Sequence, residues 1–211
     1  MGRLIQSAGG LKDCLVIFTS DHGEMLGDHN LFRKTWPYEA SARIPFLMRA
    51  PKRWGYPEEI TCESPVGIQD IMPTILDAAG IDIPDTCTGQ SLLPIMQSDT
   101  NRVRECLHGE HAGCYAYDHG NHYVTDGCYK YIWYSQTGKD HLFNLEEDPH
   151  ETHDIASDPD AETKLQPWWS RLIEFLKDRP EGFTDGTTLI PGRPHDALLP
   201  DYEPEATYPY L

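Results

Sequence analysis

The chain has few positive charges, no long apolar run and no Cys-x-x-Cys pair, and each absence removes a class of function. It carries 17 lysines and arginines against 34 aspartates and glutamates, which gives a formal net charge of −17. Nucleic-acid binding needs a basic patch, so we expect no nucleic-acid partner. A membrane span needs about 20 consecutive apolar residues. The sequence has no such run, so we expect no membrane partner.

The six cysteines are irregularly spaced and do not form a recognisable metal-binding motif. Six cysteines allow many disulfide connectivities, and the sequence does not choose among them. In a chain of 211 residues we interpret them as free thiols that pack as small hydrophobic side chains. They therefore do not identify a compartment.

What the sequence does contain is an apolar run at residues 15–18 that leads into Asp21 and His22. A continuous apolar run is typical of a strand buried on both faces of a sheet. Ligands of open α/β sheets bind beyond the carboxyl ends of such strands. Asp21 and His22 are therefore candidate ligands for a hard cation such as Ca²⁺ or Mg²⁺, and His29 and Lys34 follow in the same loop. From these residues alone, the favoured interpretation is that Asp21 caps the turn after the strand and His22 is a core histidine with its hydrogen bonds satisfied.

Three further elements are expected before residue 100. The sequence predicts a strand at residues 44–49, a helix at 67–79 and a short helical turn at 91–96. Within the predicted helix, Pro73 is tolerated only near the first turn or at a kink. We interpret Asp70 and Asp77 as capping or solvated side chains.

From residue 104 onward, short runs of β-branched and aromatic residues alternate with turn residues. They predict an antiparallel sheet with strands at residues 105–110, 122–125, 129–134 and 141–144. Residues 160–178 then have the apolar spacing of a helix, with Trp168 and Trp169 in the core rather than on a binding platform. Lys130 is expected to be solvated.

The pair His108 and His111, with Glu110 between them, has the composition of a metal site. In a strand, however, residues three apart point to opposite faces of the sheet. We therefore do not expect this pair of histidines to bind zinc.

Several segments of the chain resemble the C-terminal part of the sulfatase family, within the alkaline-phosphatase-like superfamily. The resemblance covers about residues 11–178, and the segments that carry it are Val16–Pro51, Gly67–Gly80, Gly127–Tyr134 and His141–Glu151. It implies an α/β fold class, namely the C-terminal part of an alkaline-phosphatase-like α/β sandwich followed by a small antiparallel sheet plus helix subdomain. We expect the sandwich portion at residues 1–100, the subdomain at 101–179 and an extended, proline-rich tail at 180–211.

The resemblance also implies roles for individual residues. Asp21 and His22 would hold one divalent cation, Ca²⁺ or Mg²⁺, together with aspartates from upstream sequence. Lys34 would contact the sulfate and the leaving oxygen, while His29 would either contact substrate or support the site. Because the subdomain of related sulfatases borders the cleft, the candidate contacts to the rest of the substrate are Glu110, His111 and His119.

One feature of the family is missing from these 211 residues. Sulfatases carry a Cys-x-Pro-x-Arg motif whose cysteine becomes formylglycine, the nucleophile, and none of the six cysteines here begins that motif. The resemblance thus implies a C-terminal portion of a sulfuric ester hydrolase, with formylglycine supplied from upstream and no activity in this chain alone. The alternatives are a phosphonate monoester hydrolase or phosphodiesterase of the same superfamily, and a non-catalytic truncated module.

The expected partner is an anionic sulfate-ester substrate. The predicted strand at residues 15–18 would lack neighbours in this chain, and pairing with a second copy in a homo-oligomer is one remedy. The compartment stays open between cytoplasmic and periplasmic or secreted, because a signal peptide would belong to the upstream part.

Overall fold

The computed structural model describes residues 11–98, 101–113 and 115–194. Short 3₁₀ turns connect many of the regular elements. The strands are β1 (Val16–Thr19), β2 (Phe46–Arg49), β3 (Leu107–His111), β4 (Asn121–Thr125), β5 (Tyr129–Tyr134) and β6 (Asp140–Asn144). The helices are α2 (Glu39–Ala42), α3 (Ile71–Ala78), α4 (Leu93–Met96) and α5 (Ala161–Leu176). No helix in the described part of the chain is long and apolar enough to cross a membrane.

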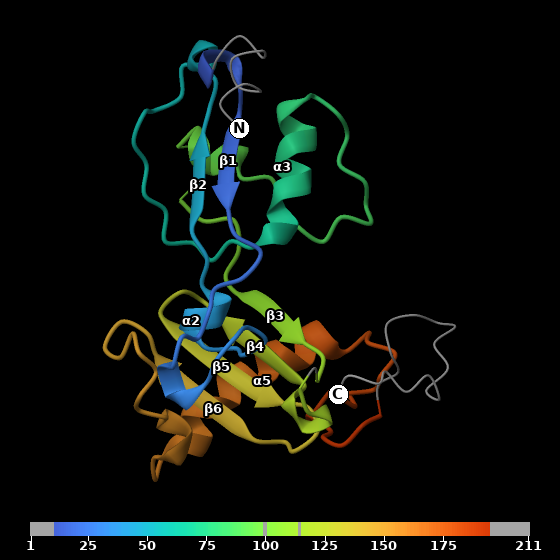
Figure 1. The fold of residues 1–211 in the computed structure, drawn as a ribbon. Helices are drawn as coiled ribbons and strands as arrows, with labels where there is room; N and C mark the ends of the chain where they lie inside the picture. Colours follow the sequence, from blue (N-terminus) through green and yellow to red (C-terminus); the bar gives the residue numbers. More distant parts are fainter. Residues whose placement is uncertain (1–10, 99–100, 114, 195–211) are drawn as a thin grey trace, which may run out of the picture.

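The strands form two separate antiparallel sheets, β1-β2 and β3-β4-β5-β6. Figure 1 shows α3 beside the β1-β2 pair at one end of the molecule, and the four-stranded sheet with α2 and α5 at the other. The sequence predicted all of these strands and the helices α3, α4 and α5, with boundaries that differ by a few residues. The mixed α/β fold class with a small antiparallel sheet and helix is confirmed.

The prediction that the first strand is buried on both faces is wrong. Phe18 of β1 lies opposite Leu47 of β2, and these two side chains are 59% and 62% exposed. The reason is that β1 pairs only with β2 among the described residues, so nothing in this part of the chain covers that face. Association of this face with a second copy of the chain stays a prediction.

Asp70 joins the two ends of the molecule. Its carboxylate accepts hydrogen bonds from the backbone N–H groups of Gly67 and Gln90, so its predicted capping role is confirmed. The alternative of a solvated side chain is wrong, because Asp70 is completely buried and Arg104 pairs with both of its carboxylate oxygens at 2.7 and 2.5 Å. Arg104 lies just before β3, so this ion pair connects the start of α3 to the four-stranded sheet.

The main core lies between the four-stranded sheet and α5. Alternate residues of the strands point toward the helix, and the helix contributes one apolar stripe. Trp168 belongs to this cluster and Trp169 packs against it, which confirms the core interpretation of both tryptophans. The buried members are Val124, Tyr131, Trp133, Leu142, Leu165, Trp168, Leu172, Leu176 and Phe183.

Phe183 shows that the start of the predicted tail is packed against the domain. A backbone bridge between Thr184 and Leu189 follows it, and Leu189 packs against the same core. The rest of the predicted tail, residues 195–211, lies outside the described residues.

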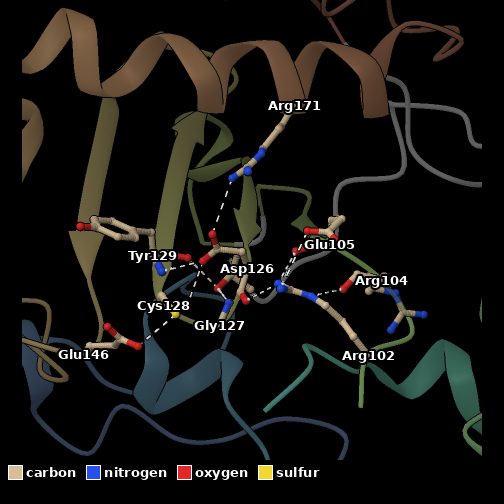
Figure 2. A network of polar contacts seen from close by, with 10 residues as sticks. Arg102, Arg104, Glu105, Asp126, Gly127, Cys128, Tyr129, Glu146 and Arg171 are labelled. Carbon is tan, nitrogen blue, oxygen red and sulfur yellow. Dashed lines mark hydrogen bonds and ion pairs between the residues drawn. The ribbon is translucent and has the colours of Figure 1, made fainter. Parts of the chain in front are cut away.

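The turn between β4 and β5 is organised by Asp126, as Figure 2 shows. Its Oδ1 accepts the backbone N–H groups of Cys128 and Tyr129, and the turn glycine, Gly127, has a φ of 97° that favours glycine. Arg171 of α5 reaches the other carboxylate oxygen at 3.7 Å. The Asp126 side chain thus fixes this hairpin turn and connects it to α5.

Four cysteines of the described residues are free thiols, as expected: Cys62, Cys87, Cys106 and Cys128. Cys128 donates its S–H to the Glu146 carboxylate, and this hydrogen bond raises the pKa of the thiol. Burial raises the pKa of the Cys106 thiol. Cys114 lies outside the described residues.

The opposite face of the four-stranded sheet receives the segment between β1 and β2. Lys130 of β5 points into this contact and is 1% exposed, so the prediction that it is solvated is wrong. It is neutralised there by Glu39 of α2 and by Glu151. Sequence alone placed Lys130 on the surface because neither carboxylate is near it along the chain.

Candidate functional site

The candidate metal and sulfate contacts, Asp21, His22, His29 and Lys34, lie on the segment of residues 20–43, which we call the site loop. It begins directly after β1 and crosses from the β1-β2 pair to the four-stranded sheet (Figure 1). Its first turn is fixed by two backbone hydrogen bonds of 2.8 Å, from Gly23 N–H to the Ser41 carbonyl and from Glu24 N–H to the Ala40 carbonyl. The start of the loop is therefore held against α2.

Gly23 is required at this close approach. A Cβ at position 23 would lie 2.1 Å from the backbone oxygen of Ala40, far inside van der Waals contact. We expect Gly23→Ala to push the loop away from α2 and to lower the free energy of unfolding by about 1–3 kcal/mol. Urea denaturation checks the prediction. Gly27→Ala is a comparison that carries backbone strain, because φ is 106°, but no steric overlap, because a Cβ there meets no atom within 4 Å. Equal stability of Gly23→Ala and the unmodified chain would contradict it.

Asp21 and His22 form the most polar point of the loop. The Nδ1 atom of His22 donates to the Gly23 carbonyl at 2.6 Å, so in the neutral ring the lone pair is on Nε2. This Nε2 lies 3.6 Å from Asp21 Oδ2, and the Asp21 side chain is 82% exposed. A carboxylate oxygen and a ring nitrogen thus lie side by side and open to solvent. This donor set fits a divalent cation that is bound by oxygen and one imidazole.

Backbone strain is concentrated in the same loop. Leu26, His29, Asn30, Arg33 and Thr35 all have positive φ angles, and among the described residues only two other non-glycine residues do. For a β-branched residue such as Thr35, with φ of 89°, this is a true outlier. Strained backbone of this kind persists where surrounding contacts fix it, and it is frequent at functional sites.

Lys34 lies between two of these strained residues. It is exposed, and it has no ion-pair partner in the part of the chain that the structure describes. The neighbouring Thr35 is held by a 3.3 Å hydrogen bond from the Asn121 side chain to its carbonyl. The structure therefore anchors the backbone beside Lys34 to the four-stranded sheet and leaves the ammonium group available for an anion.

His29 is held by contacts outside the loop's first turn. Its ring stacks on Tyr38 with 4.1 Å between centroids, and its Nε2 lies 3.1 Å from the His150 carbonyl. Burial raises the pKa of the Tyr38 hydroxyl. The structure brings His29 together with the chain that follows β6; its contact with substrate stays a prediction.

His111 and His119 lie on the side of the sheet that faces the site loop. His111 pairs across the strands with Asn121, the residue that contacts Thr35. His119 packs against Trp36 of the loop at 4.8 Å between ring centroids. Trp36 Nε1 and His119 Nδ1 are both buried, and neither has a hydrogen-bond partner among the described residues.

Glu110 lies on the opposite face, toward α5, because alternate residues of β3 point in opposite directions. Its carboxylate is bound by Arg179 at 2.8 and 2.9 Å and lies 3.3 Å from His122 Nδ1. These partners, His122 first, lower the pKa of Glu110 to about 2. Burial, with His122 as the second cause, lowers the pKa of His108 to about 4.

Sequence reasoning missed two residues that lie at the site: Trp36 and Asn121. Trp36 lies only two residues after Lys34, so its proximity to the predicted site was a usable signal. Asn121 had no such signal, because the pairing of β3 with β4 and the docking of the loop bring it into place.

Comparisons with known proteins show the family of this chain. Residues 27–178 match the family described as N-sulphoglucosamine sulphohydrolase, C-terminal. The chain is 38% identical over 196 residues to an arylsulfatase of Clostridium perfringens, covering 90% of this chain and 39% of that protein. It is 38% identical over 178 residues to arylsulfatase K of Rattus norvegicus, covering 79% of this chain and 31% of that protein.

A solved structure is similar as well. It is a protein in complex with its substrate D-glucosamine-2-N,6-O-disulfate, with a TM-score of 0.67 and 25% identity. The match covers 83% of this chain and 37% of that chain. The 211 residues thus span less than half the length of each of these three proteins.

Proposed function

This chain belongs to the sulfatase family, of which it is a C-terminal portion, and from that premise we propose that it supplies part of the catalytic site of a sulfuric ester hydrolase. The observation that supports the proposal most strongly is the pair Asp21 Oδ2 and His22 Nε2, two electron-rich atoms 3.6 Å apart at the end of β1. A strand end is where α/β proteins place their ligands.

In this proposal Asp21 and His22 bind a divalent cation, Ca²⁺ or Mg²⁺. When bound, such a cation polarises the oxygens of an ester and stabilises the charge that develops on them. The hydrogen bond from His22 Nδ1 to the Gly23 carbonyl orients the ring so that Nε2 is free to coordinate. The nucleophile, a formylglycine, and further carboxylate ligands would come from sequence outside these residues, so we propose that the chain alone is inactive.

Lys34 would bind the sulfate group. The net charge of −17 repels anions from the protein as a whole, so an anionic ester needs a local positive charge. An ammonium beside the sulfate oxygens offsets the charge that grows on the leaving oxygen. His29 would support the loop through Tyr38 and the His150 carbonyl, or contact substrate directly.

Trp36, His111 and His119 would contact the rest of the substrate. Trp36 offers an aromatic surface, and the unpartnered Trp36 Nε1 and His119 Nδ1 are polar atoms that a hydroxyl or amide could satisfy. The similar protein that was solved with glucosamine disulfate favours a sulfated sugar as the substrate class, with aryl sulfates as the alternative.

Calcium titration of the purified chain tests the metal ligands. We expect calcium binding that Asp21→Ala weakens by at least about tenfold, equivalent to about 1.4 kcal/mol. Asp28→Ala is the matched control, because it removes an exposed carboxylate from the same loop. Unchanged binding in Asp21→Ala would contradict the assignment. A folded chain that binds no calcium would mean that the upstream ligands are indispensable.

A chimaeric enzyme tests the reaction. The matching portion of the Clostridium perfringens arylsulfatase is replaced by this chain, and the product is assayed with an aryl sulfate, a sulfated glucosamine and a phosphonate ester. We expect sulfate ester hydrolysis, and we expect Lys34→Ala to lower kcat by about 10²–10³-fold. Lys139→Ala, a change at another exposed lysine, serves as the control. Faster cleavage of the phosphonate ester would favour the phosphonate hydrolase alternative, and full activity of Lys34→Ala would remove the lysine from the proposal.

A further inference from the structure

A second cluster of ligating side chains lies on the other face of the four-stranded sheet, between the sheet and α5. His108 and Glu110 come from β3, and His122 comes from β4. We propose that these three side chains form a binding site for a transition-metal ion, Zn²⁺, that is separate from the cation site of the site loop.

The strand register creates the cluster. Glu110 lies directly opposite His122, and His108 lies opposite Val124 on the same face of the sheet. His111, the histidine that is nearest along the strand, points to the other face and does not take part. The sequence pair of His108 and His111 is thus not the site; His122, fourteen residues from His108, completes it.

The distances suit tetrahedral zinc. His108 Nε2 lies 3.2 Å from His122 Nδ1, and His122 Nδ1 lies 3.3 Å from Glu110 Oε2. All three ligand atoms lie within 4.8 Å of one another. A tetrahedral ion with bonds of about 2.0–2.1 Å places its ligand atoms roughly 3.3–3.4 Å apart. Two ring nitrogens and one carboxylate oxygen are also the donor set of known three-ligand zinc sites.

The charge around the cluster favours a cation. Arg179 binds Glu110, but it also binds Glu181 at 2.7 Å, so one guanidinium faces two carboxylates. The set of Glu110, Glu181 and Arg179 therefore has a net charge of −1 before any metal binds. Arg179 contacts both oxygens of Glu110, so Oε2 can coordinate a metal while Oε1 keeps the guanidinium.

Aromatic packing holds the two histidine rings. The His108 ring stacks with His122 and with Phe175 of α5, at 5.4 and 5.2 Å between ring centroids. His122 is packed against Trp133 and Phe183 and is almost completely buried. Rings that are fixed by packing and surrounded by apolar side chains form a preorganised site, since little side-chain freedom is lost on binding.

Zinc titration of the full 211-residue chain tests the proposal, with Co²⁺ as a spectroscopic probe. We expect one Zn²⁺ per chain and the visible absorption of four-coordinate Co²⁺. His108→Gln and His122→Gln should each weaken zinc binding by more than about 100-fold, which is about 2.7 kcal/mol. His111→Gln, on the other face of the same strand, should leave zinc affinity unchanged.

The outcomes separate this proposal from the proposed function. A chain that binds no Zn²⁺, or a His108→Gln variant that keeps the affinity of the unmodified chain, overturns the zinc site and shows a hydrogen-bonded His-His-Glu network instead. If the glutamine variants unfold, the Co²⁺ spectrum of the unmodified chain decides alone: absence of four-coordinate bands overturns the proposal. Asp21→Ala should keep full zinc affinity. Failure of the zinc proposal therefore leaves the calcium assignment intact, and failure of the calcium assignment leaves the zinc proposal intact.

Discussion

Replacing Lys130 with methionine is expected to lower the free energy of unfolding by about 3–5 kcal/mol, the range for removing one partner of a buried ion pair. The ammonium Nζ lies 2.5 Å from Glu39 Oε1 and 3.1 Å from Glu151 Oε1. The Glu151 carboxylate is as buried as the lysine, and its Oε2 accepts the Glu39 backbone N–H at 2.6 Å. Methionine fills a similar volume but leaves two carboxylates facing each other without a cation.

The loss should depend on pH with a defined sign. Burial raises the pKa of Glu151 above its ordinary value of 4.5, and Lys130 is the strongest group that opposes this rise. Without Lys130 the pKa of the folded carboxyl rises further, so the folded state keeps a proton that the unfolded state has lost. Stability of the variant therefore falls as pH rises above about 4.5, and the loss is smaller at pH 5 than at pH 8.

Urea denaturation at both pH values measures this effect. Lys139→Met is the matched control: Lys139 is exposed, and its replacement should change stability by no more than about 0.5 kcal/mol. Adding Glu151→Gln to Lys130→Met should recover part of the lost stability, because it removes one of the two unpaired charges. A Lys130→Met protein as stable as the Lys139→Met control would show that the buried cluster contributes nothing net.

Replacing Arg104 with leucine should have an effect of similar size, about 3–5 kcal/mol. The arginine is 10% exposed, Asp70 is fully buried, and the two form a bidentate pair. Leucine would leave the Asp70 carboxylate with only its two backbone N–H donors. The contact between α3 and the segment before β3 should loosen as a result.

A double-mutant cycle isolates this interaction. Asp70→Asn combined with Arg104→Leu should be less destabilised than the sum of the single changes, since the unpaired charge is gone in the double variant. Arg53→Leu is the control, because its pair with Asp13 is exposed and 3.9 Å long, and such pairs contribute about 0–1 kcal/mol. Additive losses for Asp70→Asn and Arg104→Leu would argue against a coupled buried pair.

The sequence predicted the helices and strands where the signal for each one lies within its own residues, such as alternation with turn residues or apolar spacing. The β-type runs between residues 105 and 144 alternate with turn residues such as Asp126 and Gly127, and the structure has strands at nearly the same positions. The apolar spacing that placed Trp168 in a helix core also reflects one element alone. Element boundaries shifted because the last residues of a strand are decided by neighbouring strands.

The errors concern residues whose partners are far away along the chain. Lys130 is buried because Glu39 and Glu151 reach it from different parts of the sequence. Asp70 is buried because of Arg104, which lies 34 residues later. A charged residue looks solvated in any local window, and only tertiary contacts reverse that expectation.

The candidate site likewise contains residues that the sequence could predict and residues that only tertiary contacts bring into place. Asp21 and His22 are adjacent and follow a recognisable strand, so sequence could predict them as a pair, and the structure places their ligand atoms together. The contact between His119 and Trp36 depends on how the loop docks on the sheet, and the place of Asn121 beside Thr35 depends on that docking and on strand register. Neither leaves a pattern in sequence spacing.

The docking of the site loop has an energetic consequence for recognition. The loop is fastened at three places: at α2 through Gly23 and Glu24, at Asn121 through Thr35, and at Lys130 through Glu39. A flexible segment of this length would lose much conformational freedom on closing around a ligand, and affinity would fall by that amount. Here the contacts with the four-stranded sheet order the loop when the protein folds. Binding a ligand therefore does not carry the entropy cost of ordering the loop. The sheet acts as a rigid template for a site to which it contributes few of the reacting groups.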